Sequence, residues 1–266
     1  MFKIPPRQQQ SQAHQVAGHG GIKSLQGGRI LQKPTNAREY RLYALMRGGE
    51  ALQGLAAVSP TSYSEHDPQL GLAGEEAKGV HVFLENMTHG MKSPKILDIK
   101  IGFRAASKNE LLTHEGATPA AARWKKARLT AADVFSTSAS LGFGVVGGTG
   151  VSGTRISRGR DSIQHLREYS SDSQVYGAIR KGLERIREAV REEWMAPLGA
   201  SVLIAFDEAS DNRASSVKVK LIDLAHTFGV EEGLTQEQVT KYQDRFILGI
   251  SSLISTIAEI SSEKHL

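Results

Sequence analysis

An aspartate and a lysine stand two positions apart in a segment whose other residues are typical of a buried strand. Residues 96–101 read Ile-Leu-Asp-Ile-Lys-Ile, and this enrichment in β-branched residues predicts a strand. Strand side chains alternate between two faces, so Asp98 and Lys100 point to the same face about 7 Å apart. The opposite face carries only aliphatic side chains: Leu97, Ile99 and Ile101. We expect the aliphatic face to pack on a core and the polar face to offer groups that can bind a ligand.

The polar face has two interpretations, because burying a charge is costly unless the charge is paired or used. One interpretation is an internal ion pair between Asp98 and Lys100 that fixes the register of the strand. The other is a binding or catalytic site, to which Gly102 would add a turn or a close approach of the backbone. The segment alone leaves both open.

Other strands are predicted on either side of this one. A hairpin is expected within residues 14–33. Its Gly20–Gly21 and Gly27–Gly28 pairs are expected to form a glycine-rich tip, whose backbone N–H groups can cover phosphates. Apolar, β-branched runs predict further strands at residues 80–85, 141–148, 201–206 and 217–222.

Three helices are predicted, and most of them lie late in the chain. Residues 173–194 form the clearest one, because apolar residues recur there every three or four positions. A capping box opens each of the others: Asn36 with Glu39 for a helix to about Arg47, and Thr235 with Gln238 for the last helix. Residues 51–79 are expected to be a loop. Strands early and helices late favour a two-lobed α+β fold over alternating β-α-β units.

Composition narrows the class of protein. The chain has 266 residues, a net charge of +5 and no cysteine, so disulfides and thiolate metal sites are excluded. A mildly basic protein suits an anionic partner, but no nucleic-acid-binding signature is present and aromatic residues make up only 6%. No apolar run is long enough to predict a transmembrane segment. The basic cluster of Arg123, Lys125 and Lys126 has a plain interpretation as a solvated helix face.

Five separated segments, in order along the chain, resemble the inositol polyphosphate kinase family. The segment PKILDIKIG at residues 94–102 matches the family's PxxxDxKxG signature. The others are HQVAGH at 14–19, ASVL at 200–203, LIDLAHT at 221–227, and the last helix with Phe246, Gly249, Ile250 and Leu253. Lys125-Lys126 followed by LGF at 141–143 is similar to the multikinase branch, in particular its short plant-like members.

The resemblance implies a two-lobed α+β fold related to protein kinases, with ATP between the lobes. It implies an N-lobe at 13–90 and a C-lobe at 91–266, and the Gln- and Pro-rich composition of residues 1–12 predicts a disordered tail before them. A short inositol-phosphate-binding insertion is implied around residues 105–140. The implied activity is an ATP- and Mg²⁺-dependent transferase that phosphorylates hydroxyls of inositol trisphosphate and tetrakisphosphate. Phosphoinositide head groups are a further implied partner, and the expected location is intracellular, either cytoplasmic or nuclear.

The resemblance also implies roles for individual residues. Asp223 would hold Mg²⁺ against the ATP phosphates, Asp98 would bind the ribose hydroxyls, and Lys100 would contact the transferred phosphoryl group or the substrate. Glu85 and Met87 lie at the family's hinge, where backbone groups meet adenine, and Leu203 would pack near the base. His226 would polarise or orient the attacking hydroxyl. Four basic residues would bind substrate phosphates: Arg123, Lys125, Lys126 and Arg160.

The sequence departs from the family pattern at the N-lobe lysine that reaches the ATP phosphates. Gln32 takes that position without a gap, whereas Lys33 takes it if one residue is inserted as a bulge. Glu39 would be the ion-pair partner of Lys33. Ala200 replaces the first serine of the family's serine pair, and the Gly-, Ser- and Arg-rich residues 148–172 leave substrate preference open. The Gln32 departure motivates an alternative: a non-catalytic module of the same fold that binds inositol phosphates or phosphoinositides.

Overall fold

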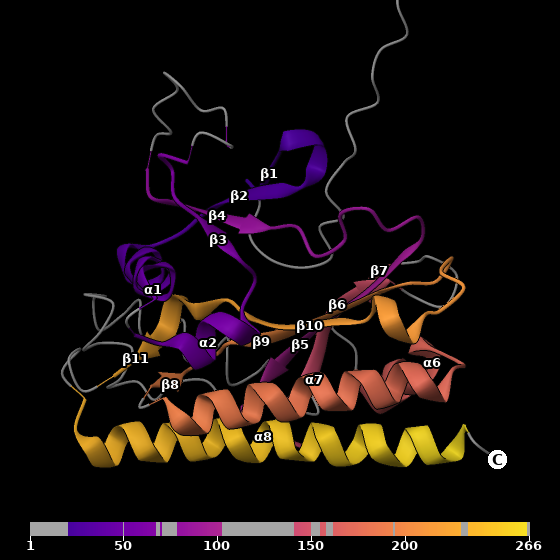
Figure 1. The fold of residues 1–266 in the computed structure, drawn as a ribbon. Coiled ribbons are helices and arrows are strands. Elements are labelled where there is room, and N and C mark those ends of the chain that lie inside the picture. The colour runs from indigo at the N-terminus through magenta and orange to yellow at the C-terminus, as the bar shows by residue number, and fades with distance from the viewer. Residues whose placement is uncertain are drawn as a thin grey trace, which may run out of the picture.

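The computed structural model describes residues 21–49, 51–67, 70, 79–102, 141–149, 155–157, 162–193, 195–229 and 234–264. Within these residues, two antiparallel sheets lie one above the other, with helices below (Figure 1). The upper sheet has the strand order β1-β2-β4-β3. Its strands are β1 (Lys23–Leu25), β2 (Ile30–Pro34), β3 (Ser62–Tyr63) and β4 (His81–Glu85).

The lower, larger sheet has the order β10-β9-β5-β6-β7, so β5 lies at its centre. Its strands are β5 (Pro94–Ile101), β6 (Phe143–Thr149), β7 (Arg155–Ser157), β9 (Ser201–Asp207) and β10 (Lys218–Ile222). Two short strands, β8 (Ala196–Pro197) and β11 (Thr227–Phe228), form a third pair. The chain changes sheet between Glu85 and Pro94, while the expected lobe boundary near residue 90 stays a prediction.

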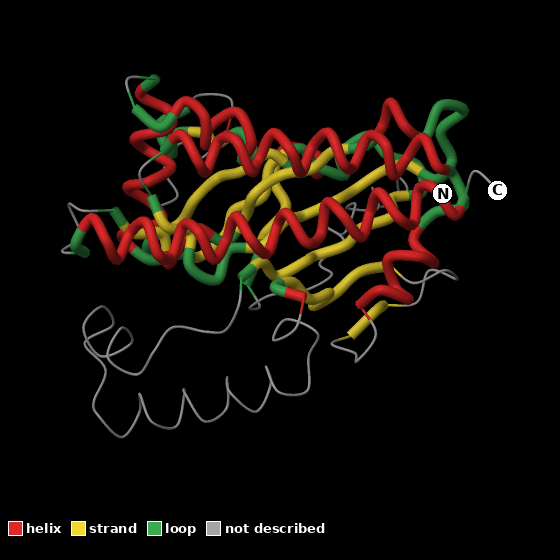
Figure 2. Tube along the Cα trace, turned by 90° about the horizontal axis from the view of Figure 1, so that it is seen from below, coloured by secondary structure: helices red, strands yellow, loops and turns green. Residues whose placement is uncertain are grey.

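Two long helices cover one face of the larger sheet. Seen from below, α7 (Ser173–Glu192) and α8 (Gln236–Glu263) run side by side across it (Figure 2). The predicted stripe of α7 is buried throughout the described part: Val175, Ile179, Leu183, Ile186 and Val190. Trp194, at the end of that stripe, lies outside the described residues.

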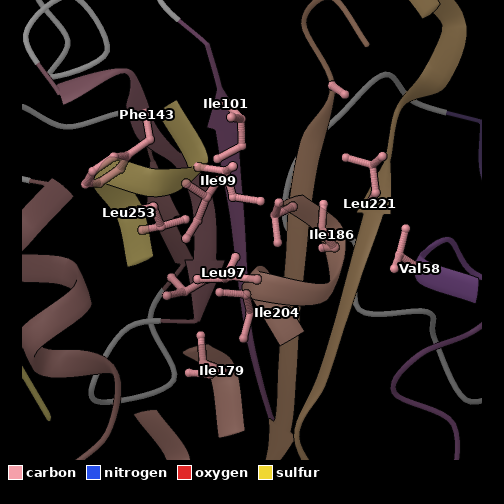
Figure 3. Close-up of a cluster of buried hydrophobic side chains, with 14 of the residues drawn as sticks. Val58, Leu97, Ile99, Ile101, Phe143, Ile179, Ile186, Ile204, Leu221 and Leu253 are labelled. Carbon is pink, nitrogen blue, oxygen red and sulfur yellow. The ribbon is translucent and has the colours of Figure 1, made fainter. Parts of the chain in front are cut away.

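The two faces of β5 separate as its sequence predicts. Leu97, Ile99 and Ile101 are at most 3% exposed and pack among residues of the helical layer and of β9, including Ile179 and Ile204 (Figure 3). Asp98 and Lys100 lie on the other face, which is turned away from α7 and α8. A purely aliphatic face is therefore what anchors the central strand while its polar face stays available.

The predicted helix starts are present, with one difference. Thr235 and Gln238 form a complete capping box at the start of α8. At α1 (Ala37–Gly48) the Asn36 side chain accepts the Glu39 N–H, but the Glu39 carboxylate does not return the bond to Asn36. That carboxylate instead bonds to residues outside α1. The prediction that it accepts the backbone N–H of Asn36, which would complete the capping box, is therefore wrong.

The expectation of a loop over residues 51–79 is also wrong in part. Residues 53–58 form the short helix α2 (Gln53–Val58), and β3 pairs with β4. A six-residue helix is too short to show a period in sequence, and what stabilises this one is packing on α7. The Gly54 N–H donates to the Glu193 carboxylate at 3.1 Å, and Leu55 is buried. The helix α6 (Ser162–Tyr169) was not predicted either.

By length and composition alone, α8 could cross a membrane. Such a test is also passed by core helices, and α8 buries one side that includes Phe246, Ile250 and Leu253. The expectation of no transmembrane segment stays a prediction.

Gly249 in α8 allows a close backbone approach. A Cβ at this position would overlap the Gly142 carbonyl oxygen and lie 3.0 Å from the Gly102 nitrogen, and neither backbone atom can rotate away. We expect Gly249→Ala to lower the free energy of unfolding by about 1–3 kcal/mol in urea denaturation. Gly177→Ala in α7 is the matched control, because nothing lies within 4 Å of its Cβ; it should gain about 0.5–1 kcal/mol. Equal effects of the two changes would contradict this account of the helix–sheet contact.

Candidate functional site

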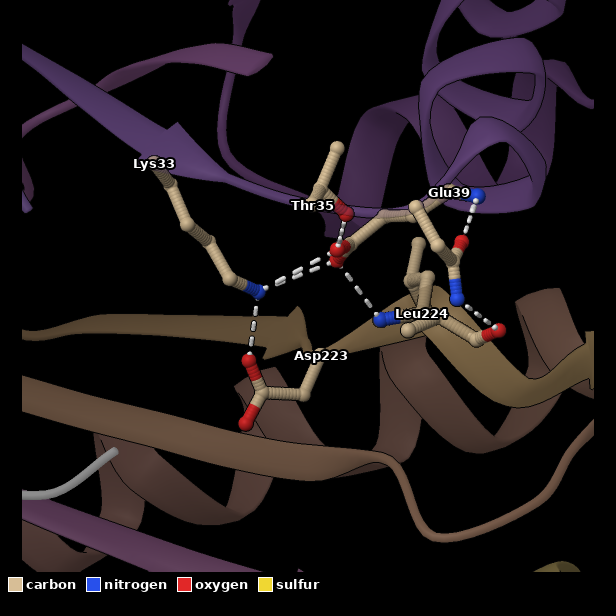
Figure 4. Close-up of polar contacts among 7 residues, drawn as sticks. Lys33, Thr35, Glu39, Asp223 and Leu224 are labelled. Carbon is tan, nitrogen blue, oxygen red and sulfur yellow. Dashed lines mark hydrogen bonds and ion pairs between the residues drawn. The ribbon is translucent and has the colours of Figure 1, made fainter. Parts of the chain in front are cut away.

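Lys33 from the upper sheet and Asp223 from the lower one form an ion pair between the two sheets (Figure 4). The Lys33 Nζ lies 2.7 Å from Oδ1 of Asp223 and 3.1 Å from Oε1 of Glu39. Burial alone would lower the pKa of Lys33, but the charges of Asp223 and Glu39 outweigh burial and raise it. Lys33 is therefore held as a cation at the junction of the sheets.

Strand alternation turns Gln32 and Lys33 to opposite faces of β2. Gln32 lies opposite Phe83 and is buried with only 6% of its surface exposed, whereas Lys33 lies opposite Val82 and extends to Asp223. The register between β2 and β4 runs from Ile30 to Pro34 without a break, so no bulge is needed. Lys33 is the residue that reaches the site.

Glu39 is almost fully buried and accepts several hydrogen bonds. Besides Lys33, its carboxylate accepts the Thr35 hydroxyl and the backbone N–H of Leu224, the latter at 3.0 Å. A buried carboxylate needs such compensation because it has lost its water. Glu39 thus connects α1 both to Lys33 and to the segment that follows Asp223.

Asp223 stands between β10 and the 3₁₀ helix η4 (Leu224–His226) with a left-handed backbone. Its φ of 61° is unusual for a residue other than glycine, although aspartate tolerates this region better than most. Its side chain is 39% exposed, so one oxygen can pair with Lys33 while the carboxylate remains open to a ligand. Strained backbone of this kind is concentrated at functional sites.

Asp98 is a buried carboxylate with an unusual protonation equilibrium. Burial first, and the charge of Asp223 second, raise its pKa to about 6, while the Ser201 hydroxyl, Lys100 and Lys33 act in the opposite direction. Its Oδ1 is buried without a hydrogen-bond partner. The charges of Lys33 and Asp223 therefore affect the pKa of Asp98, although the three residues come from β2, the end of β10 and β5.

Lys100 and His226 approach the same turn from two sides. Lys100 lies opposite Ser201 in the β5–β9 ladder, and its Cε and Nζ lie 3.7 and 3.8 Å from where a Cβ of Gly199 would be. Gly199 has a φ of +65°, which favours glycine, and a side chain at this position would make only ordinary contact with the lysine. The His226 carbonyl accepts the N–H of Leu198 at 3.1 Å. This turn thus connects β5 to the segment that carries Asp223.

The residues predicted at the hinge lie at the other end of β2. Met87 is buried with Ile96 and Ala205, and Leu203 packs against this apolar group. Leu203 also lies opposite Asp98 in the β5–β9 ladder, so the apolar group adjoins the carboxylate. The Glu85 side chain accepts Lys218 and Thr61, and its N–H donates to the Thr61 carbonyl. The Glu85 amide is thus used within the protein.

The expected hairpin is present, and Gly27–Gly28 belongs to its turn between β1 and β2. The expectation that Gly20–Gly21 and Gly27–Gly28 form one tip is wrong for Gly21. The Asn86 side chain donates to the Gly28 carbonyl at 2.7 Å, so the Gly27–Gly28 turn lies at the hinge end of β2. Lys33 is three residues further along β2 than its first residue, about 10 Å away. This turn is therefore not beside the Lys33–Asp223 pair, and Gly20 lies outside the described residues. Gly21 lies at the other end of the hairpin, against Pro34.

Several predicted features lie outside the described residues and stay predictions. They are the tail at 1–12, the segment at 14–19, the insertion around 105–140, and the basic residues Arg123, Lys125, Lys126 and Arg160.

The donor groups fit a magnesium-like cation that binds chiefly through phosphates. Among the residues that the structure describes, no group of three or more His, Cys, Asp or Glu side chains could hold a metal by itself. Mg²⁺ commonly binds through one or two carboxylates together with substrate phosphates. Asp223 supplies one accessible carboxylate, which suits a cation that takes its other ligands from phosphates.

Comparison with known proteins identifies the family. A sequence model of the inositol polyphosphate kinase family matches residues 81–258, more than half of the chain. The chain belongs to the inositol polyphosphate kinase family. The predicted family, α+β kinase-related fold and enzyme class are thereby confirmed: by family this is an ATP-dependent kinase of inositol polyphosphates.

Individual relatives agree with this assignment. An inositol polyphosphate multikinase of Schizosaccharomyces pombe is 24% identical over 249 residues, covering 80% of this chain and 86% of that protein. The crystal structure of an inositol phosphate multikinase from S. cerevisiae, in complex with ADP and Mn²⁺, is similar with a TM-score of 0.63 and 19% identity. The match covers 87% of this chain and 99% of that one. A second multikinase structure has a TM-score of 0.59 and 19% identity, with 85% and 99% coverage.

The sequence analysis overlooked several residues that support the candidate site of this kinase. The bond from Leu224 to Glu39 and the approach of Lys100 to Gly199 depend on contacts between segments far apart in sequence. Tyr43, whose hydroxyl is fully buried without a hydrogen-bond partner, has its pKa raised by burial and by Glu39 and Asp223. Of these features, only the turn at Gly199 has a local signal in the sequence: a proline two residues before a glycine, which is typical of turns.

The Asp98 carboxylate should cost stability at neutral pH. Its folded pKa of about 6 exceeds the ordinary 3.8, so the folded state binds this proton more tightly, and stability falls as pH rises from about 4 to 6. An asparagine side chain at this position would resemble the protonated acid. Without nucleotide or metal, we expect Asp98→Asn to raise the free energy of unfolding at pH 7.5 by about 1–3 kcal/mol, and to change it little at pH 4.

Urea denaturation at both pH values measures this difference. Asp244→Asn, at an exposed position of α8, is the control and should stay within about 0.5 kcal/mol at either pH. A lower stability of Asp98→Asn at pH 7.5 would mean that Lys33 and Lys100 stabilise the carboxylate more than burial destabilises it.

Proposed function

We propose that this kinase transfers the γ-phosphoryl group of ATP to a hydroxyl of an inositol polyphosphate at the junction of the two sheets. The observation that supports this site is the ion pair of Lys33 with Asp223, together with Asp98, whose pKa both of their charges affect. In the reaction a bond forms between the hydroxyl oxygen and the γ-phosphorus, and the bond from that phosphorus to the bridging oxygen of ADP breaks. The hydroxyl proton is released.

Lys33 and Asp223 would each contribute to binding the ATP phosphates, Lys33 directly and Asp223 through a metal ion. Asp223 would hold Mg²⁺, which neutralises negative charge on the ATP phosphates. Lys33, already a cation, would exchange its contact with Asp223 for a phosphate oxygen while keeping Glu39. The ADP and Mn²⁺ bound to the S. cerevisiae multikinase support nucleotide and divalent-metal use, and Mg²⁺ as the physiological ion is our proposal.

The nucleotide's base and sugar would lie toward the hinge. Leu203 and the apolar group around Met87 offer a surface for adenine, and the backbone near Glu85 and Met87 would recognise its edge. Asp98, directly opposite Leu203, would accept the ribose hydroxyls. Two hydroxyl donors would satisfy the buried oxygen that has no partner in the protein.

The substrate would bind on the side of Lys100 and His226. Lys100 would contact the transferred phosphoryl group, and His226 would orient the attacking hydroxyl. Arg123, Lys125, Lys126 and Arg160 would bind the remaining phosphates of the substrate. The S. pombe relative, an inositol polyphosphate multikinase, supports an inositol polyphosphate as the acceptor. Inositol trisphosphate and tetrakisphosphate as the particular acceptors, and phosphoinositide head groups as a further ligand, are our proposal. We place this activity in the cytoplasm or nucleus.

The non-catalytic alternative loses its main motive. It rested on Gln32 occupying the position of the N-lobe lysine, whereas Lys33 makes the contacts expected of that lysine. A thermal-shift comparison separates the two functions, because a ligand that binds the native state raises Tm. Stabilisation by inositol phosphates but not by ATP with Mg²⁺ would favour the binding module. Product identification from a panel of inositol phosphates and other small alcohols then defines the acceptor.

Two substitutions test the catalytic assignments. We expect Asp223→Asn and Lys100→Ala to lower kcat at least about 100-fold, because each removes a charge that acts on the phosphoryl group. Chromatography of inositol phosphate products measures turnover, and circular dichroism checks the fold. Asp244→Asn, at an exposed position of α8, serves as the control with ordinary turnover. Substantial activity in Asp223→Asn would remove the metal assignment.

The basic cluster is tested by substrate affinity. Replacing both Lys125 and Lys126 by Ala should raise KM several-fold for inositol tetrakisphosphate and less for inositol trisphosphate. The trisphosphate has fewer phosphates that would lose a lysine partner. KM for ATP should stay unchanged. If KM for both inositol phosphates is also unchanged, these lysines belong to a solvated surface.

A further inference from the structure

Three residues in the first turn of α1 and at its N-cap contact the segment that follows Asp223. We call Asn36, Arg38 and Glu39 the α1 clamp. The Asn36 side chain donates to the Ala225 carbonyl at 3.3 Å, and the Arg38 guanidinium lies 4.2 Å from the centre of the Phe228 ring. Glu39 accepts the Leu224 N–H. The clamp therefore fixes residues 224–228 from outside, although it belongs to a helix far earlier in the chain.

The contact of Glu39 lies directly after the residue with the unusual backbone. Asp223 has a φ of 61° and a ψ of 55°, and the next N–H, that of Leu224, points into the Glu39 carboxylate. A residue other than glycine keeps such a conformation only where its surroundings hold it. The Leu224 N–H is also the first donor of η4, and a carboxylate at this position satisfies it. Glu39 thus favours the backbone state that directs the Asp223 side chain toward Lys33.

From this geometry we propose that Glu39 is a positioning residue for the metal-binding carboxylate, acting through the Leu224 N–H independently of its ion pair with Lys33. The inference rests on the proposed role of Asp223. Its partner Lys33 has the opposite effect on the metal, because Lys33 occupies Asp223 Oδ1 at 2.7 Å and competes with a cation for it. One carboxylate of α1 therefore prepares the site, while the lysine beside it limits access.

The two roles of Glu39 can be separated by substitution. Glu39→Gln keeps an oxygen that can accept the Leu224 N–H but loses the charge that pairs with Lys33. Glu39→Ala removes both functions. Lys33→Met removes the ion pair and leaves the bond to Leu224 intact. Comparing the three variants distinguishes an effect through Leu224 from an effect through Lys33.

The experiment measures Mn²⁺ binding to the ADP complex by electron paramagnetic resonance, without turnover. We expect the Kd for Mn²⁺ to rise at least about 10-fold in Glu39→Ala and less than about 3-fold in Glu39→Gln, because only the first loses the bond to Leu224. In Lys33→Met it should stay unchanged or fall, even if ADP itself binds more weakly. Hydrogen exchange of the peptide that contains Leu224 should accelerate in Glu39→Ala and stay slow in Lys33→Met.

Each outcome bears on one claim. A Kd for Mn²⁺ in Glu39→Ala equal to that of the wild type overturns the inference, as does an equal loss in Glu39→Ala and Glu39→Gln. Should Glu39→Ala not fold, the remaining pair decides: weaker Mn²⁺ binding in both Glu39→Gln and Lys33→Met would assign the whole effect to the ion pair. Failure of the wild-type protein to bind Mn²⁺ with ADP would instead overturn the proposed function.

The rest of the clamp offers a matched pair on one helix. Arg38→Ala removes the contact with Phe228 and should raise the Kd for Mn²⁺ about 2- to 3-fold, in keeping with the modest strength of a cation–π contact. Arg41→Ala, at an exposed position of the same helix, should leave it unchanged. Equal values for Arg38→Ala and Arg41→Ala would restrict the positioning effect to Glu39 and contradict a clamp of three residues.

Discussion

The site depends on a single ammonium group that joins two sheets. Lys33 extends from β2 to a buried carboxylate on α1 and to an accessible one at the end of β10. Because Glu39 is 1% exposed and Asp223 is 39% exposed, the two bonds of Lys33 differ in kind. The first is fixed by the cost of leaving a charge buried without a partner. The second is at an accessible carboxylate and can be exchanged, so under the proposed function one lysine would be both part of the framework and a ligand for phosphate.

Carboxylates close to one another give the site its chemistry and also its cost. Burial and the charge of Asp223 raise the pKa of Asp98 to about 6, so ionising both carboxylates at neutral pH is unfavourable for the protein by itself. A divalent cation and ribose hydroxyls would both relieve this situation. The aliphatic face of β5, packed beneath by Leu97 and Ile99, supplies the rigid support against which such an unfavourable polar face can be held.

The sequence was sufficient where a signal is local. Alternation in β5 identified Asp98 and Lys100, and the apolar period identified α7, because both follow from backbone geometry alone. It failed at α2, which owes its existence to contact with α7. It found the turn at Gly27–Gly28 but placed Gly21 in the same tip, although Gly21 lies at the other end of the hairpin, near Pro34. Only the partner strand shows which faces Gln32 and Lys33 take, since register fixes the face on which a side chain lies.

The short helix α2 has a consequence for how the protein exchanges its ligands. It belongs to the chain segment between α1 and β3, yet it is anchored on α7 beneath the larger sheet by Leu55 and by the bond from Gly54 to Glu193. The segment acts as a strap between the layers. The two sheets cannot move apart as rigid bodies without first breaking these contacts, so at the proposed site ligands would exchange through local movements at its edge.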